Sequence, residues 1–532
     1  MFSAALQIGH ESFGSRKGLA RFLDWRLLFC GSIIGVAALP TLWLLFSTVD
    51  IGSLLASLHG SSIGVLKRTF LLFGTVIAGA LAFGWPLGTL IGLVRFPGQR
   101  VLFAALAVPM FTPASLWAIG MSCVRPLVAY RHQLWFDGFY GALFTGLVQV
   151  LPLVVFASYF LSKTIPGSQL DAALLAAGWP GLLRVATRFS FPGALAAGVL
   201  GGLVAISDPG PAQIMGYHGM ASEIFISFSA RYNAALAAQK ALLLCLLLLP
   251  LLLPLSWMTA TWSENHLLGR DIRRVCPGLS GIIPWLILLL CGTVLIALLS
   301  VPIVGFIRPL HSTQTLQSFK FDWSVLKQSA PTTIRYCFTA AVLSSLLGFF
   351  LTLVAGRKHQ GRFLLLLFSF VFLSMPASLH ALGFAGIASQ LPDSFDWLTR
   401  GGNAPGLAFA FRWLPIPTLF CLRAWSLVPE TCHECAALHG IPAIQYHWRT
   451  TVPQLFPVLI CSFVLVALAS AADVSSTLIL IPPGAATFTT RIFGVIDSTT
   501  ERTLSVLCLL YIASGFVLLT ILSFLSGSQR RT

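Results

Sequence analysis

Runs of about twenty apolar residues recur along the whole chain, separated by short polar loops. A helix needs a run of this length to cross a hydrocarbon layer of roughly 30 Å. The short alternating strands of a membrane β-barrel are not seen in the sequence. Windows of about 19 residues predict twelve spans, at residues 26–47, 69–94, 101–123, 139–161, 193–216, 237–261, 279–305, 333–356, 363–388, 405–427, 454–480 and 503–527. The pattern therefore predicts an all-α polytopic membrane protein.

Composition supports this prediction and argues against a soluble domain, a nucleic-acid-binding protein and a disulfide-rich protein. The chain has 532 residues, 56% of them hydrophobic and 9% charged, whereas a soluble domain carries about 25% charged residues. The net charge of +16 resides in short loops between apolar runs, where basic residues set membrane topology, so we expect no nucleic-acid partner. The 11 cysteines are scattered and do not suggest a disulfide framework.

The basic residues also predict an orientation. An even number of spans places both termini on one side, and both ends are basic, with Arg16 and Lys17 near the start and Arg530 and Arg531 at the end. Because positive loops stay on the cytoplasmic side, we expect cytoplasmic termini and a multi-pass protein of the bacterial inner (cell) membrane.

An internal repeat divides the chain into two similar parts. The string PASLWAIG, from Pro113 to Gly120, returns 263 positions later as PASLHALG, from Pro376 to Gly383. Such self-similarity indicates tandem structural units. We therefore predict a first module (1–262), a linker (263–277) and a second module (278–532). Each module has six spans, which predicts a parallel pseudo-twofold arrangement with a pathway between the modules.

Each module also carries a helix–glycine–helix loop after its fourth span, and we name these loops the first hairpin (162–192) and the second hairpin (429–453). In the second, an acid and two alanines precede a glycine, and a proline closes the loop. Its residues are Glu434, Ala436, Ala437, Gly440 and Pro453, and those of the first are Asp171, Ala172, Ala173, Gly178 and Pro192.

These residues resemble the EAA motif of permeases from binding-protein-dependent ABC importers. The second hairpin has the motif's spacing of six and thirteen residues, with Cys435 in place of one alanine; the first hairpin is one residue longer in each interval. Two fused six-span modules look most like the iron(III), thiamine and aminoethylphosphonate permease group. We therefore expect the second hairpin to form the better contact with the ATPase.

The resemblance implies the function and the partners. Each hairpin would be a coupling helix that docks on one of two copies of a cytoplasmic ATPase, which binds ATP and Mg²⁺. A periplasmic binding protein would deliver the solute, iron(III) being the leading candidate. The sequence has no phosphate-binding GxxxxGK[ST] loop and no catalytic constellation, so we expect no enzymatic activity and no cofactor in this chain.

Two carboxylates and one guanidinium fall within predicted spans. Asp208 lies about 24 Å of helix beyond Pro192, and Asp473 lies about 30 Å beyond Pro453. Ionisable groups at this depth are costly and are functional candidates. One hypothesis is that both acids line the outer mouth of a pathway for a cationic solute. The other is that each carboxylate caps a broken helix or pairs with a basic residue, such as Arg412 for Asp473.

Two further alternatives remain at this stage. The acids could carry protons in a secondary transporter with two six-span halves, although the paired hairpins would then have no role. Cys432, Cys435 and His439 share one helical face and are residue types that zinc prefers. The first hairpin has no such set, so we expect no metal site.

Overall fold

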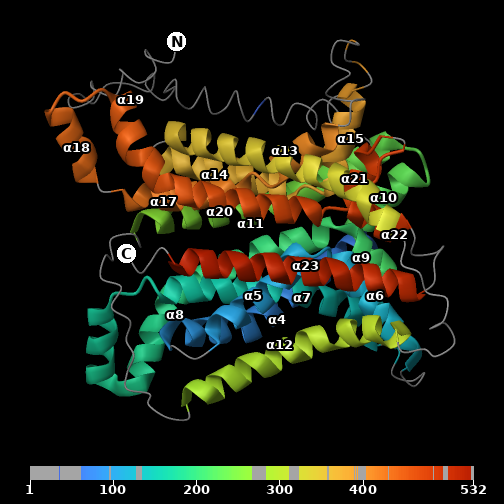
Figure 1. The fold of residues 1–532 in the computed structure, drawn as a ribbon, viewed down its shortest axis with the longest axis horizontal. Coiled ribbons are helices and arrows are strands. Elements are labelled where there is room, and N and C mark those ends of the chain that lie inside the picture. Colours follow the sequence, from blue (N-terminus) through green and yellow to red (C-terminus); the bar gives the residue numbers. More distant parts are fainter. Residues whose placement is uncertain are drawn as a thin grey trace.

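The computed structural model describes a helical membrane protein whose helices run roughly parallel to one long axis (Figure 1). The described residues are 35, 61–94, 98–127, 133, 135–265, 283–310, 323–355, 359–388, 390, 392, 403–428, 430–482, 484–494 and 501–528. Apart from residue 35, the first predicted span (26–47) lies outside them, as do both basic termini and most of the linker, so the predicted orientation is not tested. No strand occurs in the described residues.

The helices follow one another in the same general order in both modules. In the first module they are α4 (Ser61–Leu93), α5 (Gln99–Phe111), α6 (Ala114–Val124), α7 (Gly138–Ser162), α8 (Gly167–Ser207), α9 (Pro209–Ile214), α10 (Met220–Ser229) and α11 (Ala234–Asn265). In the second they are α12 (Ile283–Ile307), α13 (Trp323–Ala355), α14 (His359–Ser374), α15 (Ala377–Ala388), α16 (Ala404–Arg412), α17 (Pro415–Leu427), α18 (Glu430–Leu438), α19 (Ala443–Tyr446), the π-helical turn η8 (His447–Thr451), α20 (Val452–Ala471), α21 (Ser475–Leu480), α22 (Phe488–Gly494) and α23 (Glu501–Ser528).

The predicted spans after the first correspond to the helices of the structure. Eight described helices are long and apolar enough to cross a membrane, and three bent pairs raise the number to 11 when each pair counts as one span. The all-α fold is therefore confirmed, whereas the pseudo-twofold arrangement of the modules stays a prediction.

Three predicted spans are each formed by two helices with a bend between them. The span 101–123 is bent by 94° between α5 and α6, 363–388 by 92° between α14 and α15, and 405–427 by 47° between α16 and α17. The first two bends lie next to Pro113 and Pro376, at the start of the repeated PASL strings. Proline has no N–H to donate and disfavours a helical conformation in the residue before it, so a repeated proline yields a repeated bend.

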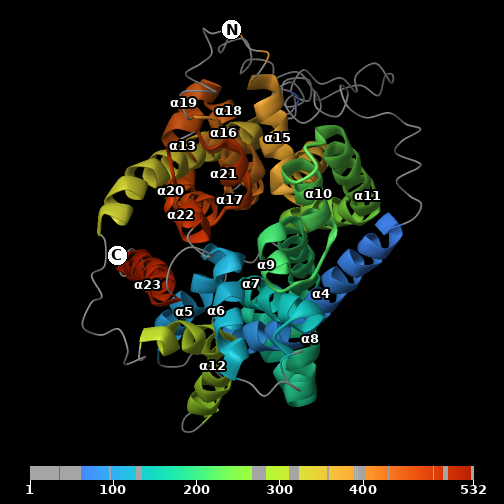
Figure 2. The ribbon, with the colours of Figure 1, turned by 90° about the vertical axis from the view of Figure 1, so that its right-hand side faces the viewer.

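The two modules interlock at their boundary. In the second module α12 packs against α6 of the first, and α23 packs against α5, while α11 of the first module packs against α14. Figure 2 shows α12 and α23 beside α5 and α6. A Cβ atom added to Gly305 of α12 would lie 1.9 Å from the carbonyl oxygen of Gly120 in α6. The glycine in the first PASL string therefore allows two backbones to meet, which is how membrane helices often associate.

Candidate functional site

Both hairpins project from one end of the helical bundle. Figure 1 shows the first as the teal bend of α8 at the lower left and the second as α18 and α19 at the upper left. We call this the hairpin end. The short helices α9, α10, α21 and α22 lie at the opposite end, which we call the far end (Figure 1). The chain thus places its two matched loops on one surface, as a shared docking role requires.

The first hairpin turns at Gly178 within α8. The backbone there has φ 61° and ψ −151°, a combination essentially restricted to glycine. A Cβ atom on Gly181 would lie 2.6 Å from the carbonyl oxygen of Ala173, so this second glycine lets the two arms approach closely. The second arm then runs through Pro192 into the span without a break. Pro192 lies within the length of α8 and does not end the helix.

The second hairpin turns at Gly440, which has a φ of 64°. The N–H of Ile441 donates to the carbonyl oxygen of Ala436 at 2.9 Å, the bond that closes a helix end when glycine takes the left-handed conformation. Gly440 is thus a helix C-cap. The returning arm passes from α19 through η8 into α20, and Pro453 lies in the first turn of α20. As in the first hairpin, the arm joins its span without an interruption.

Exposed apolar side chains stand at equivalent places on the two hairpins. Leu175 lies four residues after Asp171 and is 89% exposed, and Leu438 lies four residues after Glu434 and is 85% exposed. Directly after the turn glycines, Trp179 and Ile441 are 47% and 43% exposed. Exposed apolar side chains at matched places on both hairpins are candidates for a protein interface. The acids Asp171 and Glu434 are also exposed.

The alanines of the two hairpins differ in burial. Ala172 is exposed and Ala173 is partly buried, whereas Ala436 is buried. The backbone of Ala437 is helical, and its side chain lies outside the described part. Within the predicted motif, the glycines Gly178 and Gly440 make the turn of each hairpin. The exposed apolar side chains near each turn, Leu175 and Leu438, lie outside the predicted motif residues.

The three charged candidates meet between the modules, on the far side of the spans from the hairpins. The Arg412 guanidinium donates from Nη1 to Asp473 Oδ2 at 2.6 Å and from Nη2 to Ser207 Oγ at 3.1 Å. Asp208 Oδ1 accepts from Ser475 Oγ at 3.0 Å and from the backbone N–H of Gly210 at 3.0 Å. The structure thus brings the predicted residues together and adds two serines that the sequence analysis did not single out.

Each carboxylate also caps a broken helix. α8 ends at Ser207, and α9 restarts at Pro209 with Asp208 as its N-cap. In the second module α20 ends at Ala471, and Asp473 Oδ1 accepts from the backbone N–H of Ser476 at 3.1 Å. The proposed pairing of Arg412 with Asp473 and the proposed capping roles are therefore confirmed. Whether the acids also contact a solute is not tested.

The two acids differ in their surroundings. The side chains of Arg412 and Asp473 are 5% and 1% exposed, whereas Asp208 is partly exposed. Removing one partner from a buried ion pair leaves an uncompensated charge and costs roughly 3–5 kcal/mol. Asp473 accordingly depends on Arg412 for neutralisation of its charge, whereas Asp208 has no ion pair in the described part of the chain.

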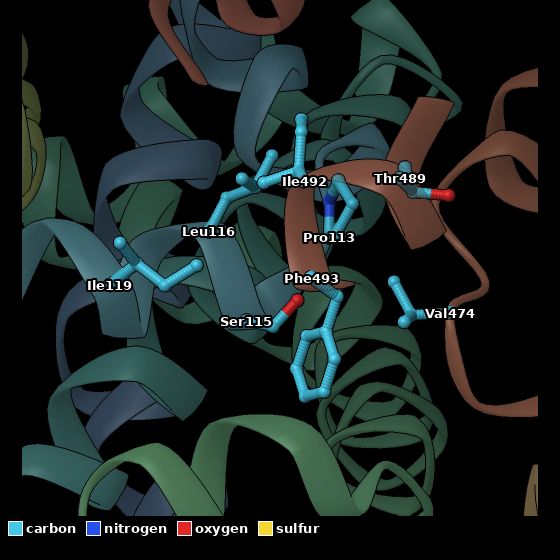
Figure 3. Close-up of a pocket in the computed structure, with 8 residues that line it drawn as sticks. All are labelled: Pro113, Ser115, Leu116, Ile119, Val474, Thr489, Ile492 and Phe493. Atoms are coloured by element: carbon cyan, nitrogen blue, oxygen red, sulfur yellow. The ribbon is translucent and has the colours of Figure 1, made fainter. Parts of the chain in front are cut away.

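A small apolar pocket, too narrow to hold a water molecule, lies next to this network (Figure 3). Pro113, Ser115, Leu116 and Ile119 line it from the first module, and Val474, Thr489, Ile492 and Phe493 line it from the second. None of these eight side chains carries a charge. The pocket marks the boundary between the modules and does not by itself identify an ionic solute.

A second ion pair stabilises the far end of the first module. Lys240 Nζ in α11 lies 2.8 Å from Glu223 Oε2 in α10 and also donates to Ser227 Oγ at 3.1 Å. The hydrogen bond from Lys240 holds the pKa of Glu223 below its usual range, against an opposing effect of burial. This pair fastens α10 to α11 within one module and contributes nothing to the boundary between modules.

The described residues contain no group of three His, Cys, Asp or Glu side chains that could hold a metal ion. Cys435 and His439 are exposed on the second hairpin, where His439 Nδ1 contacts the carbonyl oxygen of Cys435 at 3.0 Å.

Comparisons with known proteins agree with this geometry. Residues 344–531, all within the second module, match the model of the family described as binding-protein-dependent transport system inner membrane component. The chain is also 25% identical over 213 residues to the molybdate/tungstate transport system permease protein of Thermococcus kodakarensis, covering 39% of this chain and 84% of the relative. No solved structure matches significantly.

Neither match covers half of this chain; the family is described as part of binding-protein-dependent transport, and the relative is named as a transport permease. Together with the 8 to 11 candidate spans, they support a multi-pass transmembrane permease of the ABC type, a transport subunit rather than an enzyme.

Proposed function

We propose that this chain supplies both six-span modules of the permease part of a binding-protein-dependent ABC importer. It moves a small solute from the periplasm to the cytoplasm by alternating access, across the bacterial inner membrane. One copy of a cytoplasmic ATPase docks on each hairpin, and a periplasmic binding protein delivers the solute at the far end. The observation that supports this proposal best is the pair of hairpins at one end, each with a glycine turn and an exposed leucine at the same place.

The hairpins suit this task mechanically. Each returning arm continues directly into a span that ends at one of the two acids, Ser207–Asp208 in α8 and Ala471–Asp473 after α20. A displacement of a hairpin by the ATPase is therefore transmitted along one rigid helix to the boundary between the modules. Packed helices of this kind shift between discrete arrangements rather than deform continuously.

The charges at the boundary between the modules bear on the class of solute. Asp208, Asp473 and Arg412 together carry one net negative charge, which favours a cation such as iron(III), in agreement with the resemblance to the iron(III), thiamine and aminoethylphosphonate group. The relative from Thermococcus kodakarensis is named for molybdate and tungstate, which are oxyanions, so molybdate is the second candidate. We propose iron(III) first because Asp208, a carboxylate without an ion pair in the described part of the chain, would repel an oxyanion.

Transport by reconstituted protein tests the proposal. The chain would be placed in liposomes with the ATPase and binding protein encoded beside its gene, and uptake of iron(III), thiamine, aminoethylphosphonate and molybdate measured. We expect ATP-dependent uptake of one probe, abolished when the ATPase is left out. Uptake by the chain alone, driven by a pH gradient, would instead establish a proton-coupled secondary transporter.

A further inference from the structure

Two side-chain hydrogen bonds cross between the modules at the broken helices. Ser475 Oγ of the second module donates to Asp208 Oδ1 of the first at 3.0 Å. Arg412 Nη2 of the second module donates to Ser207 Oγ of the first at 3.1 Å. Both acceptors lie at the junction of α8 and α9. Figure 2 looks onto the far end, where α9 and α21 lie on the two sides of this boundary.

The ion pair, in contrast, lies within one module. Arg412 and Asp473 both belong to the second module, and their contact of 2.6 Å orients the guanidinium so that its other nitrogen reaches Ser207. Separation of the modules would thus break the two crossing bonds and leave the buried charges paired. A hydrogen bond to a hydroxyl can be exchanged for one to water at small net cost, whereas separation of a buried ion pair is expensive.

The first module has an uncharged residue at the position that matches Arg412. Gln149 lies 263 residues before Arg412, the spacing of the two PASL strings, and each residue stands two positions before a Leu-Pro pair. α7, which carries Gln149, packs on α9 as α16, which carries Arg412, packs on α21. Gln149 Oε1 is buried and makes no hydrogen bond to any described residue. One arginine therefore serves both modules.

We propose that Ser207, Asp208, Arg412 and Ser475 form a latch that closes the pathway at the far end and opens once in each transport cycle. This inference rests on the proposed function. In that function, ATP-driven movement of the hairpins opens the far end to the binding protein, and this opening must break both crossing bonds. Because coupling between two sites is reciprocal, the latch in turn restrains the ATPase while no loaded binding protein is present.

Removal of the crossing bonds tests the latch without disturbing the ion pair. Ser207→Ala with Ser475→Ala, in the full assembly with ATPase, should raise ATP hydrolysis in the absence of binding protein about tenfold, equivalent to about 1.4 kcal/mol. Ser369→Ala is the matched control, because this buried serine contacts Thr418 within the second module and should leave basal hydrolysis unchanged. Unchanged hydrolysis in the double variant would overturn the latch.

A covalent replacement gives the opposite effect. Asp208→Cys with Ser475→Cys should form a disulfide under mild oxidation. This disulfide should reduce the ATP hydrolysis stimulated by the binding protein at least tenfold, and chemical reduction should restore it. Each single cysteine variant should show no such reversible loss. Absence of the cross-link, or full activity of the cross-linked assembly, would overturn the latch alone. A wild-type assembly with no ATPase would instead overturn the proposed function and with it the latch.

Discussion

The two modules share a backbone plan but differ in their charges. Each has a right-angled bend at a PASL string, a hairpin turned by a glycine with positive φ, and a helix that breaks at an aspartate. Among the described residues, the aspartate of the second module pairs with Arg412 and that of the first has no ion pair; the first module has Gln149 at the position that matches Arg412. The comparison teaches that two repeated modules can keep their turns at matching positions and yet differ in charged contacts. Here one arginine, Arg412, contacts residues of both modules.

The hairpins differ in a similar way. The second closes by a left-handed C-cap at Gly440, a standard end of a helix, whereas Gly178 adopts a conformation that other residues rarely reach. The longer spacing of the first hairpin therefore corresponds to a different turn that places Leu175 and Leu438 equally far out. The leucines at the two tips are similarly exposed, Leu175 at 89% and Leu438 at 85%, and whether the second hairpin makes the stronger ATPase contact stays a prediction.

The largest expected contrast between the modules concerns the two aspartates. Asp473→Asn leaves the buried Arg412 without a counter-charge and should destabilise the protein by roughly 3–5 kcal/mol. Asp208→Asn retains an oxygen that can accept from both Gly210 and Ser475, so the loss should be about 1 kcal/mol. Apparent melting temperatures of the purified variants in detergent measure the loss of stability in each variant.

A compensating variant sharpens this prediction. Arg412→Gln combined with Asp473→Asn removes both charges and gives the second module the residue of the first at position 412. It should recover most of the stability that Asp473→Asn loses. Equal melting temperatures for Asp208→Asn and Asp473→Asn would show that the modules do not differ as described.

A smaller contrast is expected at the turn glycines. Asparagine tolerates the left-handed conformation of Gly440, so Gly440→Asn should cost less than about 1 kcal/mol. The backbone of Gly178 lies outside that region, and Gly178→Asn should cost about 1–3 kcal/mol. Hydrogen exchange of residues 167–190 and 430–446 should show faster exchange in the first hairpin variant only, and equal exchange would contradict the difference in turn type.

Much of the fold could be predicted from apolar periodicity, because each span needs about twenty apolar residues regardless of its partners. The hairpins and the break after Asp208 were also predictable, since glycine and proline act locally. The bends within spans were missed because a window average does not register one proline. The roles of Ser207 and Ser475 could not be identified, because they depend on contacts between residues more than 200 positions apart. The role of Gln149 could not be identified either, because it depends on the lack of a hydrogen bond to its Oε1 among the described residues.

Site-specific photo-cross-linking measures the central claim, that both hairpins bind an ATPase. A benzoylphenylalanine would replace Leu175 or Leu438 in cells. Tyr232 is the control position, because it is 89% exposed and comes shortly after α10, which lies at the far end, away from the hairpins (Figure 1). The account predicts cross-links from 175 and 438 to one protein that carries a phosphate-binding GxxxxGK[ST] loop, and none from 232. Absence of that protein at both hairpin positions would contradict it.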